Sequence, residues 1–467
     1  MENKNAWNKY KAKDLKDLNR VCDGYKDFIS KGKIERECVE LTIDLVKKAG
    51  YKDILEYIKS GKKLKKGDKI YANCMGKTLA LFQIGEEPLE QGMNILGAHI
   101  DSPRADIKLN PLYEAENMAY LDTHYYGGIK KYLWVTQPMA LHGVVCLKDG
   151  TTVKVTVGDD PKDPVFCFTD LLVHLSRQQM SKPANEVVTG ENLDLLVGGQ
   201  PLAKSKLEKD QKEAVKANVL AILKKQYGIE ESDFLSAELT VVPAGAARDL
   251  GFDRSMILAY GQDDKVCAYT SLLAMLDEDK PLKRTSCCLI VDKEEIGSVG
   301  ATGMSSLFFE NTVARLVALQ GGDAYVGGHD ALAHSFMLSS DVSAGYDPLY
   351  GEAFEKKNAA FLGNGMTYNK FTGSGGKSGS NDANAEFVAK VRKIMDENDI
   401  SYQFCELGRV DVGGGGTIAY IMAKYCMNVI DSGVAVLSMH APYEVTSKAD
   451  VYEAYKGYRA FLRDAQF

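Results

Sequence analysis

The chain has 467 residues, of which 45% are hydrophobic and 26% are charged, and it carries a formal net charge of −7. This length predicts two domains, because single hydrophobic cores stop growing at about 250–300 residues. The acidic balance argues against nucleic-acid binding, and no apolar stretch approaches the roughly 20 residues of a membrane span, so we expect neither nucleic acid nor membrane as a partner.

The opening residues and the cysteines predict a cytoplasmic protein. Residues 1–20, MENKNAWNKYKAKDLKDLNR, are too polar for a signal peptide. The ten cysteines show no C-x-x-C spacing, and Cys287 and Cys288 lie within an apolar run. This pattern favours reduced, buried thiols over a disulfide framework or a zinc knuckle.

The first part of the chain predicts a helix, a hairpin and a buried strand. Residues 35–49 place Cys38, Leu41, Leu45 and Ala49 on one helical face, and Gly50 follows as a C-cap. Residues 69–85, KIYANCMGKTLALFQIG, contain two alternating runs about a Met-Gly-Lys turn and predict a β-hairpin. The next run, MNILGAHID (93–101), predicts a buried strand that ends in polar residues.

The middle of the chain predicts an inserted, β-rich domain over residues 107–250. Short strand-like runs such as LHGVVCLK (141–148) and GTTVKVTVG (150–158) alternate there with turn signals. Residues 204–228, KSKLEKDQKEAVKANVLAILKKQYG, predict one charged amphipathic helix. We therefore expect a catalytic domain built from residues 1–106 and 251–467, interrupted by this insertion.

After the insertion the pattern changes to that of an α/β domain. Residues 255–276, SMILAYGQDDKVCAYTSLLAML, predict a strand, a polar turn and a helix. A low-complexity segment, TGSGGKSGSNDAN (372–384), predicts a loop.

Two adjacent acids, Glu294 and Glu295, stand between an apolar strand and a run of glycines. The strand is CCLIVD (287–292), and the glycines belong to IGSVGATG (296–303). Glycines allow the tight turn that places the acids at the carboxyl end of the strand, where open α/β sheets bind their ligands.

Four more strand-like runs lead to potential metal ligands. NILGAH ends at His99, MILAYGQD leads to Asp263 with Asp264 beside it, SFMLSSD ends at Asp341, and AVLSMH ends at His440. Alone, a histidine at a strand end is more often structural, and an aspartate there is more often a helix N-cap. Together with the glutamates, these residues predict a shared site at one edge of one sheet.

The residue types predict a site for two divalent metals. Imidazole and carboxylate ligands suit Zn²⁺, Mn²⁺ or Co²⁺, and the absence of cysteine from the set disfavours a closed structural zinc site. One histidine for each metal and a bridging carboxylate fit two ions about 3.5–4 Å apart. One acid of the set is then not needed as a metal ligand, and it can serve as the general base for a water molecule that attacks a carbonyl. The two adjacent glutamates can divide the roles of ligand and base.

Five motifs, in their order and spacing, resemble the aspartyl aminopeptidase and vacuolar aminopeptidase I family of dinuclear zinc exopeptidases. They are GAHIDSPR (97–104), DKEEIGSVGATG (292–303), SSDVSAGYDP (339–348), GGGGTIAYIMA (413–423) and SMHAPYE (438–444). The resemblance covers nearly the whole chain. It implies a mixed-sheet α/β/α catalytic domain with an inserted β-rich dimerisation domain, two Zn²⁺ per subunit with Co²⁺ or Mn²⁺ as alternatives, and peptide substrates.

The resemblance also assigns roles to individual residues. It implies Glu294 as the general base, Asp101 as the acid that orients His99, and the metal ligands His99, Asp263, Glu295, Asp341 and His440. Asp263 would bridge the ions, although GQDDK departs from the commoner Leu-Asp-Asn and Asp264 can take this place. His174, in DLLVHLSRQ, matches a histidine that enters a neighbouring subunit's active site. Relatives form dodecamers built from dimers, so the resemblance implies a homo-oligomer.

The preferred N-terminal residue stays open. Family members divide between those that prefer acidic N-terminal residues and those that prefer neutral or hydrophobic ones. In the loop around Lys356, Lys357 and Lys377, a positively charged side chain could pair with a substrate carboxylate. Asp264 and Lys377 are therefore candidates for substrate contact.

Three other functions compete with this interpretation. A two-metal carboxypeptidase or N-deacylase would use the same metal chemistry. A phosphate loop at Gly376-Lys377-Ser378 would need a glycine at position 371, which is Phe371. A non-catalytic assembly protein would need no metal. Four further histidines are expected to have structural roles, and they are His124, His142, His329 and His334.

Overall fold

The computed structural model describes residues 5–207 and 212–466, which form two compact units. The first unit contains the chain up to Asp101, Ala247–Met439 and the residues from Glu444 onward. The second contains Ser102–Ala246 and His440–Tyr443. The boundaries expected at residues 107 and 250 fall inside strands β5 and β12, because the chain passes from one unit to the other shortly before each of these strands.

The core of the first unit is a nine-stranded mixed sheet with the order β1-β2-β3-β14-β4-β15-β19-β17-β18. Strands β14, β4, β15 and β19 run parallel at its centre. The strands are β1 (Lys52–Asp53), β2 (Lys69–Cys74), β3 (Thr78–Gln83), β4 (Met93–His99), β14 (Thr285–Val291), β15 (Phe336–Ser340), β17 (Met366–Asn369), β18 (Tyr402–Phe404) and β19 (Asn428–Gly433).

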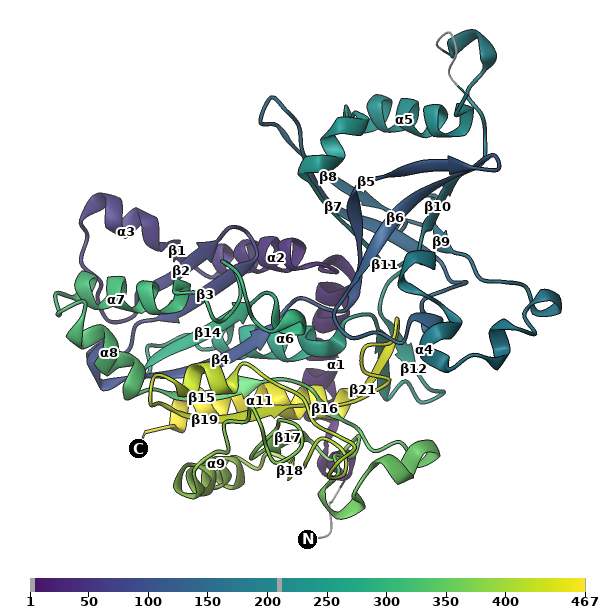
Figure 1. Ribbon diagram of the computed structural model, residues 1–467. Helices are drawn as coiled ribbons and strands as arrows, with labels where there is room; N and C mark the ends of the chain where they lie inside the picture. Colours follow the sequence, from purple (N-terminus) through teal and green to yellow (C-terminus); the bar gives the residue numbers. More distant parts are fainter. Residues whose placement is uncertain (1–4, 208–211, 467) are drawn as a thin grey trace. The chain divides into compact units, whose positions relative to one another are not determined.

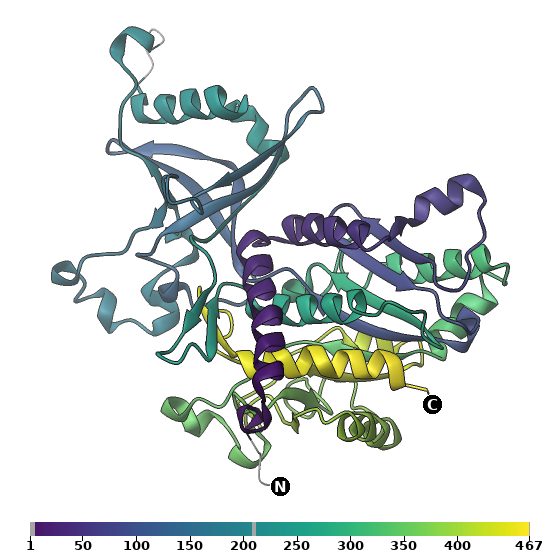
Figure 2. The same ribbon diagram turned by 180° about the vertical axis from the view of Figure 1, so that it is seen from behind.

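Helices cover both faces of this sheet (Figures 1 and 2). Strand β14 shows why: Cys287 and Leu289 pack into one apolar core, and Cys288 and Ile290 pack into the other. One core includes α1 (Ala12–Lys31), α2 (Glu35–Lys48), α6 (Gln262–Leu276), α9 (Ala385–Glu397) and α11 (Lys448–Asp464). The other includes α3 (Ile54–Ser60), α7 (Phe308–Gln320), α8 (Val326–Ala333) and α10 (Ala419–Ala423). The mixed-sheet α/β/α fold is therefore confirmed.

A five-stranded sheet corrects the expectation that all ligand-bearing strands belong to one sheet. Its order is β12-β13-β21-β20-β16, with β12 (Arg248–Leu250), β13 (Met256–Ala259), β16 (Ser343–Ala344), β20 (Ala435–Leu437) and β21 (Glu444–Ser447). The parallel pair β15–β19 continues as the parallel pair β16–β20, which joins β21 instead of the large sheet. The strands that lead to Asp263 and His440 therefore lie in this second sheet.

The predicted hairpin and the first helix are present, with one correction. Strands β2 and β3 pair antiparallel, as the turn signal predicts. Helix α2 buries Cys38, Val39, Thr42 and Val46, whereas Leu45 is exposed. The prediction that Leu45 lies on the buried face was wrong, because this face is centred on Cys38 and Thr42. The buried Thr42 hydroxyl donates to the Cys38 carbonyl.

The second unit is built on a seven-stranded sheet with the order β8-β7-β11-β5-β6-β10-β9. Its strands are β5 (Arg104–Ala115), β6 (Met118–Tyr126), β7 (Met139–Cys146), β8 (Thr152–Val157), β9 (Cys167–Phe168), β10 (Leu195–Gly198) and β11 (Ala237–Pro243). Its helices are α4 (Ala184–Val187) and α5 (Ala214–Tyr227). The helix predicted over residues 204–228 begins only at Ala214, and residues 208–211 of that range lie outside the described part of the chain.

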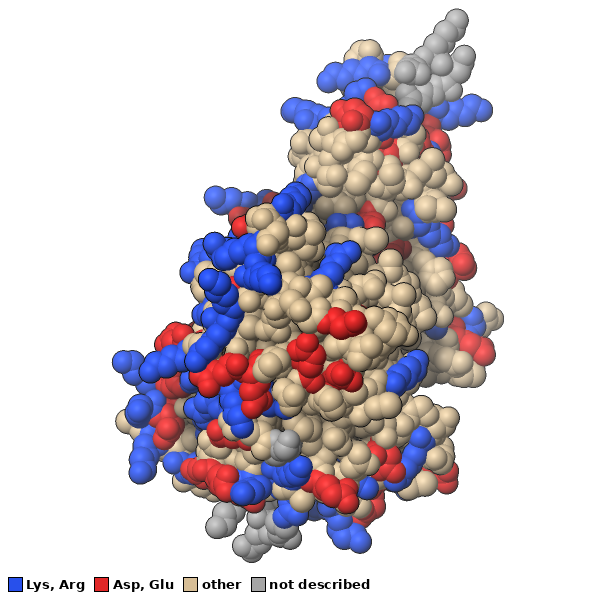
Figure 3. Space-filling view, turned by 90° about the vertical axis from the view of Figure 1, so that its left-hand side faces the viewer, with Lys and Arg blue, Asp and Glu red and all other residues tan. Residues whose placement is uncertain are grey.

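The surface charges are mixed in sign on the face drawn in Figure 3, where acidic and basic side chains lie side by side in the lower part of the view. Among the described residues, no helix combines the length and hydropathy that crossing a membrane requires. All ten cysteines are free thiols. Six of them are buried, whereas four are not, contrary to the expectation of buried thiols; these are Cys74, Cys146, Cys167 and Cys426.

Candidate metal centre

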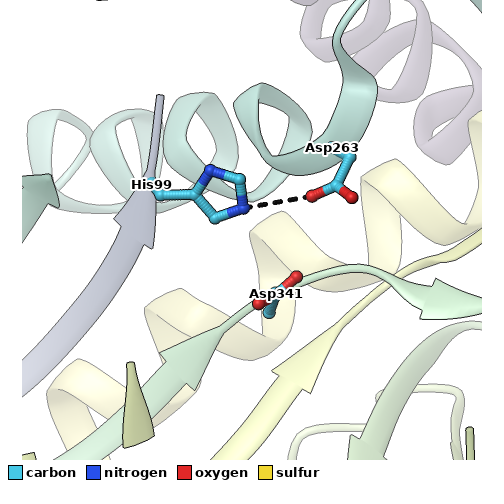
Figure 4. Close-up of side chains that lie close together, drawn as sticks. All are labelled: His99, Asp263 and Asp341. Atoms are coloured by element: carbon cyan, nitrogen blue, oxygen red, sulfur yellow. Dashed lines mark hydrogen bonds and ion pairs between the residues drawn. The ribbon is translucent and has the colours of Figure 1, made fainter. Parts of the chain in front are cut away.

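His99 ends the central strand β4 and is buried. Its Nδ1 lies 3.0 Å from the backbone carbonyl oxygen of Asp101, which can only accept, so Nδ1 donates this hydrogen bond and Nε2 is the nitrogen that remains for a metal. Nε2 lies 3.1 Å from Oδ1 of Asp263 (Figure 4). Burial disfavours the charged imidazolium, but the hydrogen bonds and charges of Asp101 and Asp263 outweigh it, and the pKa of His99 lies well above its ordinary value.

Three side chains from separate segments meet at Nε2 of His99. One ligand atom each of His99, Asp263 and Asp341 lies within 4.8 Å of the other two. Figure 4 shows Asp263 at the start of α6 and Asp341 just after β15. Burial, followed by the negative charges of Asp264 and Asp263, raises the pKa of Asp341 well above its ordinary value. When both are ionised, the two carboxylates of this cluster carry more negative charge than its single histidine can balance.

Asp263 and Asp264 differ sharply in their surroundings. The backbone N–H of Asp263 donates to Oε2 of Glu444 at 3.0 Å, and its side chain faces His99. Asp264 is fully buried, and neither of its carboxyl oxygens has a hydrogen-bond partner among the described residues. Burial raises the pKa of Asp264 well above its ordinary value. The geometry thus favours Asp263 as the ligand and offers Asp264 no contact with a substrate.

The turn that carries the two glutamates is held by Asp101. Its Oδ1 accepts from the N–H of Glu294 at 3.1 Å, and its Oδ2 accepts from the N–H of Glu295 at 3.2 Å. Oε2 of Glu294 lies 4.0 Å from Nε2 of His99. A carboxylate oxygen of Glu295 lies within 4.8 Å of one of Asp263. The adjacent acids therefore face different partners.

A glycine next to Asp341 is required by packing. A Cβ added at Gly433 would lie 1.9 Å from the carbonyl oxygen of Asp341. The backbone N–H of Asp341 donates to the carbonyl of Ser432 at 2.8 Å, so β19 fixes the point at which Asp341 leaves the sheet. Gly433 lies outside the sequence motifs that predicted the site.

Glu444 was also missed, although it ends the motif SMHAPYE. It is buried and accepts from the N–H of Asp263, while Gln262 donates to its backbone carbonyl at 2.6 Å. This pairing ties β21 to the start of α6 and sets the position of Asp263. Asp292, which precedes the glutamates, is buried as well, and burial together with Glu35 raises its pKa to about 6.

Two predicted histidines belong to the second unit. His440 lies three residues past β20, and its Nδ1 is 2.8 Å from the carbonyl oxygen of Gly128, so Nδ1 is the nitrogen that donates there. His174 lies exposed on a 3₁₀ turn, Val173–Leu175. Its neighbours Leu172, Val173 and Leu175 are 54%, 77% and 66% exposed. The leucines near His174 therefore do not pack into their own unit.

Lys377 is engaged within its own loop. Its Nζ lies 3.1 Å from Oδ2 of Asp382 and 3.8 Å from the centre of the Phe371 ring. The segment 372–384 contains neither a helix nor a strand, and α9 begins only at Ala385, whereas the Gly-Lys-Ser of a phosphate loop leads directly into a helix.

The four other histidines contact residues elsewhere. Nδ1 of His334 lies 2.7 Å from the carbonyl oxygen of Glu90, and the His329 ring packs against Tyr325. Nε2 of the buried His142 lies 3.0 Å from Asp159, and Nδ1 of His124 lies 2.7 Å from the carbonyl oxygen of Tyr125.

The donor set fits zinc. Neutral imidazole Nε2 and carboxylate oxygens are ligands that Zn²⁺ accepts, and the second nitrogen of His99 is held by a backbone carbonyl, as is usual for metal-bound histidines. A divalent cation would also offset the buried carboxylates that raise the pKa values of His99 and Asp341.

Known proteins resemble this chain in sequence and in fold. Residues 28–462 match the model of the aminopeptidase I zinc metalloprotease family (M18). A probable M18 family aminopeptidase 1 of Clostridium acetobutylicum is 56% identical over 463 residues, which cover 99% of this chain and 98% of that protein. The crystal structure of an M18 aminopeptidase from Thermotoga maritima superimposes with a TM-score of 0.93 at 42% identity, covering 99% of each chain. A dodecamer of mApe1 from Saccharomyces cerevisiae shares the fold, with a TM-score of 0.76 at 20% identity over 95% of this chain and 96% of that one.

Proposed function

The chain belongs to the aminopeptidase I zinc metalloprotease family and is a zinc aminopeptidase, and we propose that it works with two zinc ions and with Glu294 as the general base. The observation that carries this proposal is the cluster of His99, Asp263 and Asp341, with Glu295 within 4.8 Å of Asp263. Asp263 has carboxylate oxygens within 4.8 Å of ligand atoms of both His99 and Glu295, which is the position that a bridging ligand needs.

The remaining ligands divide between the two ions. His99 and Asp341 would hold one ion, and Glu295 and His440 would hold the other. In both histidines Nδ1 donates to a backbone carbonyl, which leaves Nε2 for a metal. When bound, the zinc ions polarise the peptide carbonyl and lower the pKa of a water molecule.

Glu294 is the acid that remains for proton transfer. Its backbone is anchored by Asp101 and its Oε2 lies 4.0 Å from Nε2 of His99, which places the carboxylate beside the ligands. From there it can take a proton from water and deliver it to the amine of the departing peptide. Asp101 is the positioning residue, because it contacts both His99 and the glutamate turn.

The substrates in this proposal are peptides with a free N-terminus, with acidic N-terminal residues preferred. Lys377 and Arg409 line a small cavity of about 50 Å³, where a substrate carboxylate could be bound. Glu406 and Asp411 line the same cavity, which supports the alternative of neutral or hydrophobic N-terminal residues. Rates on Asp-, Glu-, Leu- and Lys-anilides decide between the two.

We also propose a homo-oligomer, a dodecamer built from dimers, in the cytoplasm. The exposed Leu172, Val173 and Leu175 beside His174 form an apolar surface of the kind that subunit contacts cover. In this arrangement His174 would reach the partner's site and donate a hydrogen bond to the carbonyl oxygen as its charge develops. The ten free thiols support a reducing compartment.

A pair of substrates tests the proposal against its nearest rivals. We expect the zinc-loaded protein to hydrolyse a Leu-Gly dipeptide and to leave N-acetyl-Leu-Gly intact, because a blocked amine cannot occupy an aminopeptidase site. Faster cleavage of the acetylated dipeptide would instead indicate a carboxypeptidase or N-deacylase.

A further inference from the structure

The loop that carries the two adjacent glutamates is closed at its foot by a buried acid that the proposed mechanism does not use. Asp292 directly follows β14, and a parallel backbone bridge joins it to Gly303. Residues 293–302 therefore leave and return at the same place. The hydroxyl of Thr302 donates to Oδ2 of Asp292 at 2.6 Å there. Asp292 is 0% exposed and Thr302 is 4% exposed, so water does not compete for this hydrogen bond.

Thr78, the first residue of β3, ties both ends of this loop to the neighbouring strand. Its hydroxyl accepts from the backbone N–H of Asp292 at 3.2 Å and donates to the backbone carbonyl of Thr302. Thr78 is buried as well, and β3 pairs with β14 along the sheet. The three side chains thus form one hydrogen-bonded cluster that joins the two ends of the loop to the central sheet.

The turn that carries the glutamates is packed directly against this foot. The N–H of Ser298 donates to the carbonyl of Lys293 at 2.6 Å, and the N–H of Ser305 donates to the carbonyl of Ser298 at 3.0 Å. A Cβ added at Gly303 would lie 2.3 Å from the carbonyl oxygen of Ser298, so the backbones touch. A displacement of the foot therefore passes through Ser298 to Lys293, the residue immediately before the two glutamates.

Stability alone does not account for an acid at position 292. Nζ of Lys293 lies 3.6 Å from Oδ2 of Asp292, but Oδ1 is buried and has no hydrogen-bond partner among the described residues. Burying a carboxyl group costs free energy unless it is fully paired, and apolar residues of similar volume often replace a buried polar group without loss of stability. What the acid adds is a directional hydrogen bond to Thr302, which fixes the foot of the loop at one place.

The glutamate turn is held from its other side by Asp101, whose carboxylate accepts from the N–H groups of both glutamates. We propose that Asp292 and Thr302 are the second pair of positioning residues, and that their hydrogen bond keeps the two glutamates at the separate places that zinc binding and proton transfer need. Asp101 fixes the two N–H groups, and the foot of the loop prevents the turn from pivoting about them. This inference rests on the proposed function of the two glutamates.

The test removes the hydrogen bond and measures zinc affinity and kinetics separately. We expect Thr302→Val, which keeps the shape of the side chain, to weaken binding of one zinc ion about 10–100-fold in competition with a chelator. At saturating zinc it should lower kcat on Leu-p-nitroanilide by about 10–100-fold with KM within about twofold, because the bond positions the glutamates and not the substrate. Asp292→Ala removes the acceptor and should cause the same changes. Thr302→Ser keeps the donor, Asp292→Asn keeps an acceptor oxygen, and both should retain wild-type values.

Thr312→Val is the matched control for the loss of a buried hydroxyl. Thr312 is 5% exposed, and its hydroxyl donates to the carbonyl of Phe308 at 2.7 Å within α7. This variant should lower the melting temperature but leave zinc affinity and kcat unchanged. Wild-type zinc affinity and kcat in a folded Thr302→Val or Asp292→Ala protein would overturn the proposal. So would equal losses in Thr312→Val, or no recovery in Thr302→Ser. A wild-type protein that binds no zinc or does not cleave free N-termini would instead refute the proposed function.

Discussion

Asp101 connects the histidine and the two glutamates of the candidate metal centre. Its Oδ1 accepts a hydrogen bond from the N–H of Glu294, and its Oδ2 accepts one from the N–H of Glu295. Its backbone carbonyl accepts a hydrogen bond from Nδ1 of His99. The resemblance predicted only that Asp101 orients His99. The hydrogen bonds from the backbone of the turn at Glu294 and Glu295 could not be predicted from the sequence, because a backbone N–H of almost any residue type can donate them.

The two adjacent glutamates should respond differently to substitution. We expect Glu294→Gln to lower kcat by about 10²–10⁴-fold with zinc content unchanged, because the amide keeps the shape of the side chain but cannot accept the proton. Glu295→Ala should instead lose one zinc ion. Kinetics and elemental analysis of both variants check the assignment, and loss of zinc in Glu294→Gln alone would reverse it.

Asp431 should make the protein less stable as pH rises. Burial raises its pKa from 3.8 to about 7, so the folded chain binds this proton more tightly than the unfolded chain, and stability is lost between about pH 4 and pH 7. Asp431→Asn removes this titration. Its free energy of unfolding relative to wild type should therefore increase over this range by on the order of 1–3 kcal/mol and stay constant above it. Denaturant unfolding at several pH values measures the difference, and a constant difference would show that Asp431 ionises as readily as in the unfolded chain.

At the scale of elements, local patterns predicted the strands and helices that surround the site. Continuous apolar runs identified β4 and β14, and the strand-turn-helix of residues 255–276 matches β13 and α6. The five-stranded sheet was not predictable, because its strands are short and its pairing joins residues far apart in the sequence. The late start of α5 was missed since charged residues before Ala214 continue a helical pattern.

Gly433, the last residue of β19, packs closely against the backbone of Asp341 and should not tolerate a side chain. We expect Gly433→Ala to destabilise the protein by about 1–3 kcal/mol and to reduce bound zinc, because the new methyl group collides with the carbonyl of Asp341 and displaces this proposed ligand. Thermal unfolding and elemental analysis measure both effects. Gly199→Ala is the matched control, since a Cβ there meets no atom within 4 Å. Equal stability of the two variants would show that β19 can move without cost.

At the scale of the whole molecule, the proposed oligomer would let His174 of the second unit serve catalysis in another subunit. His174→Phe should lower kcat by about 10²–10³-fold without affecting folding or zinc content, because it removes a donor to the developing oxyanion. Inactive His174→Phe and inactive Glu294→Gln chains should regain activity when refolded together, since one site of each mixed dimer then has both wild-type residues. Mixed dimers that stay inactive would show that His174 does not serve a partner's site.

In the proposed mechanism, peptide hydrolysis needs two zinc ions held by His99, Asp263, Glu295, Asp341 and His440. The most direct measurement removes all metal with a chelator and then titrates zinc back while bound zinc and Leu-p-nitroanilide hydrolysis are followed together. We predict no activity without metal and a rise in activity that levels off at two zinc ions per chain. Full activity of the metal-free protein, or a plateau at one ion, would contradict this account.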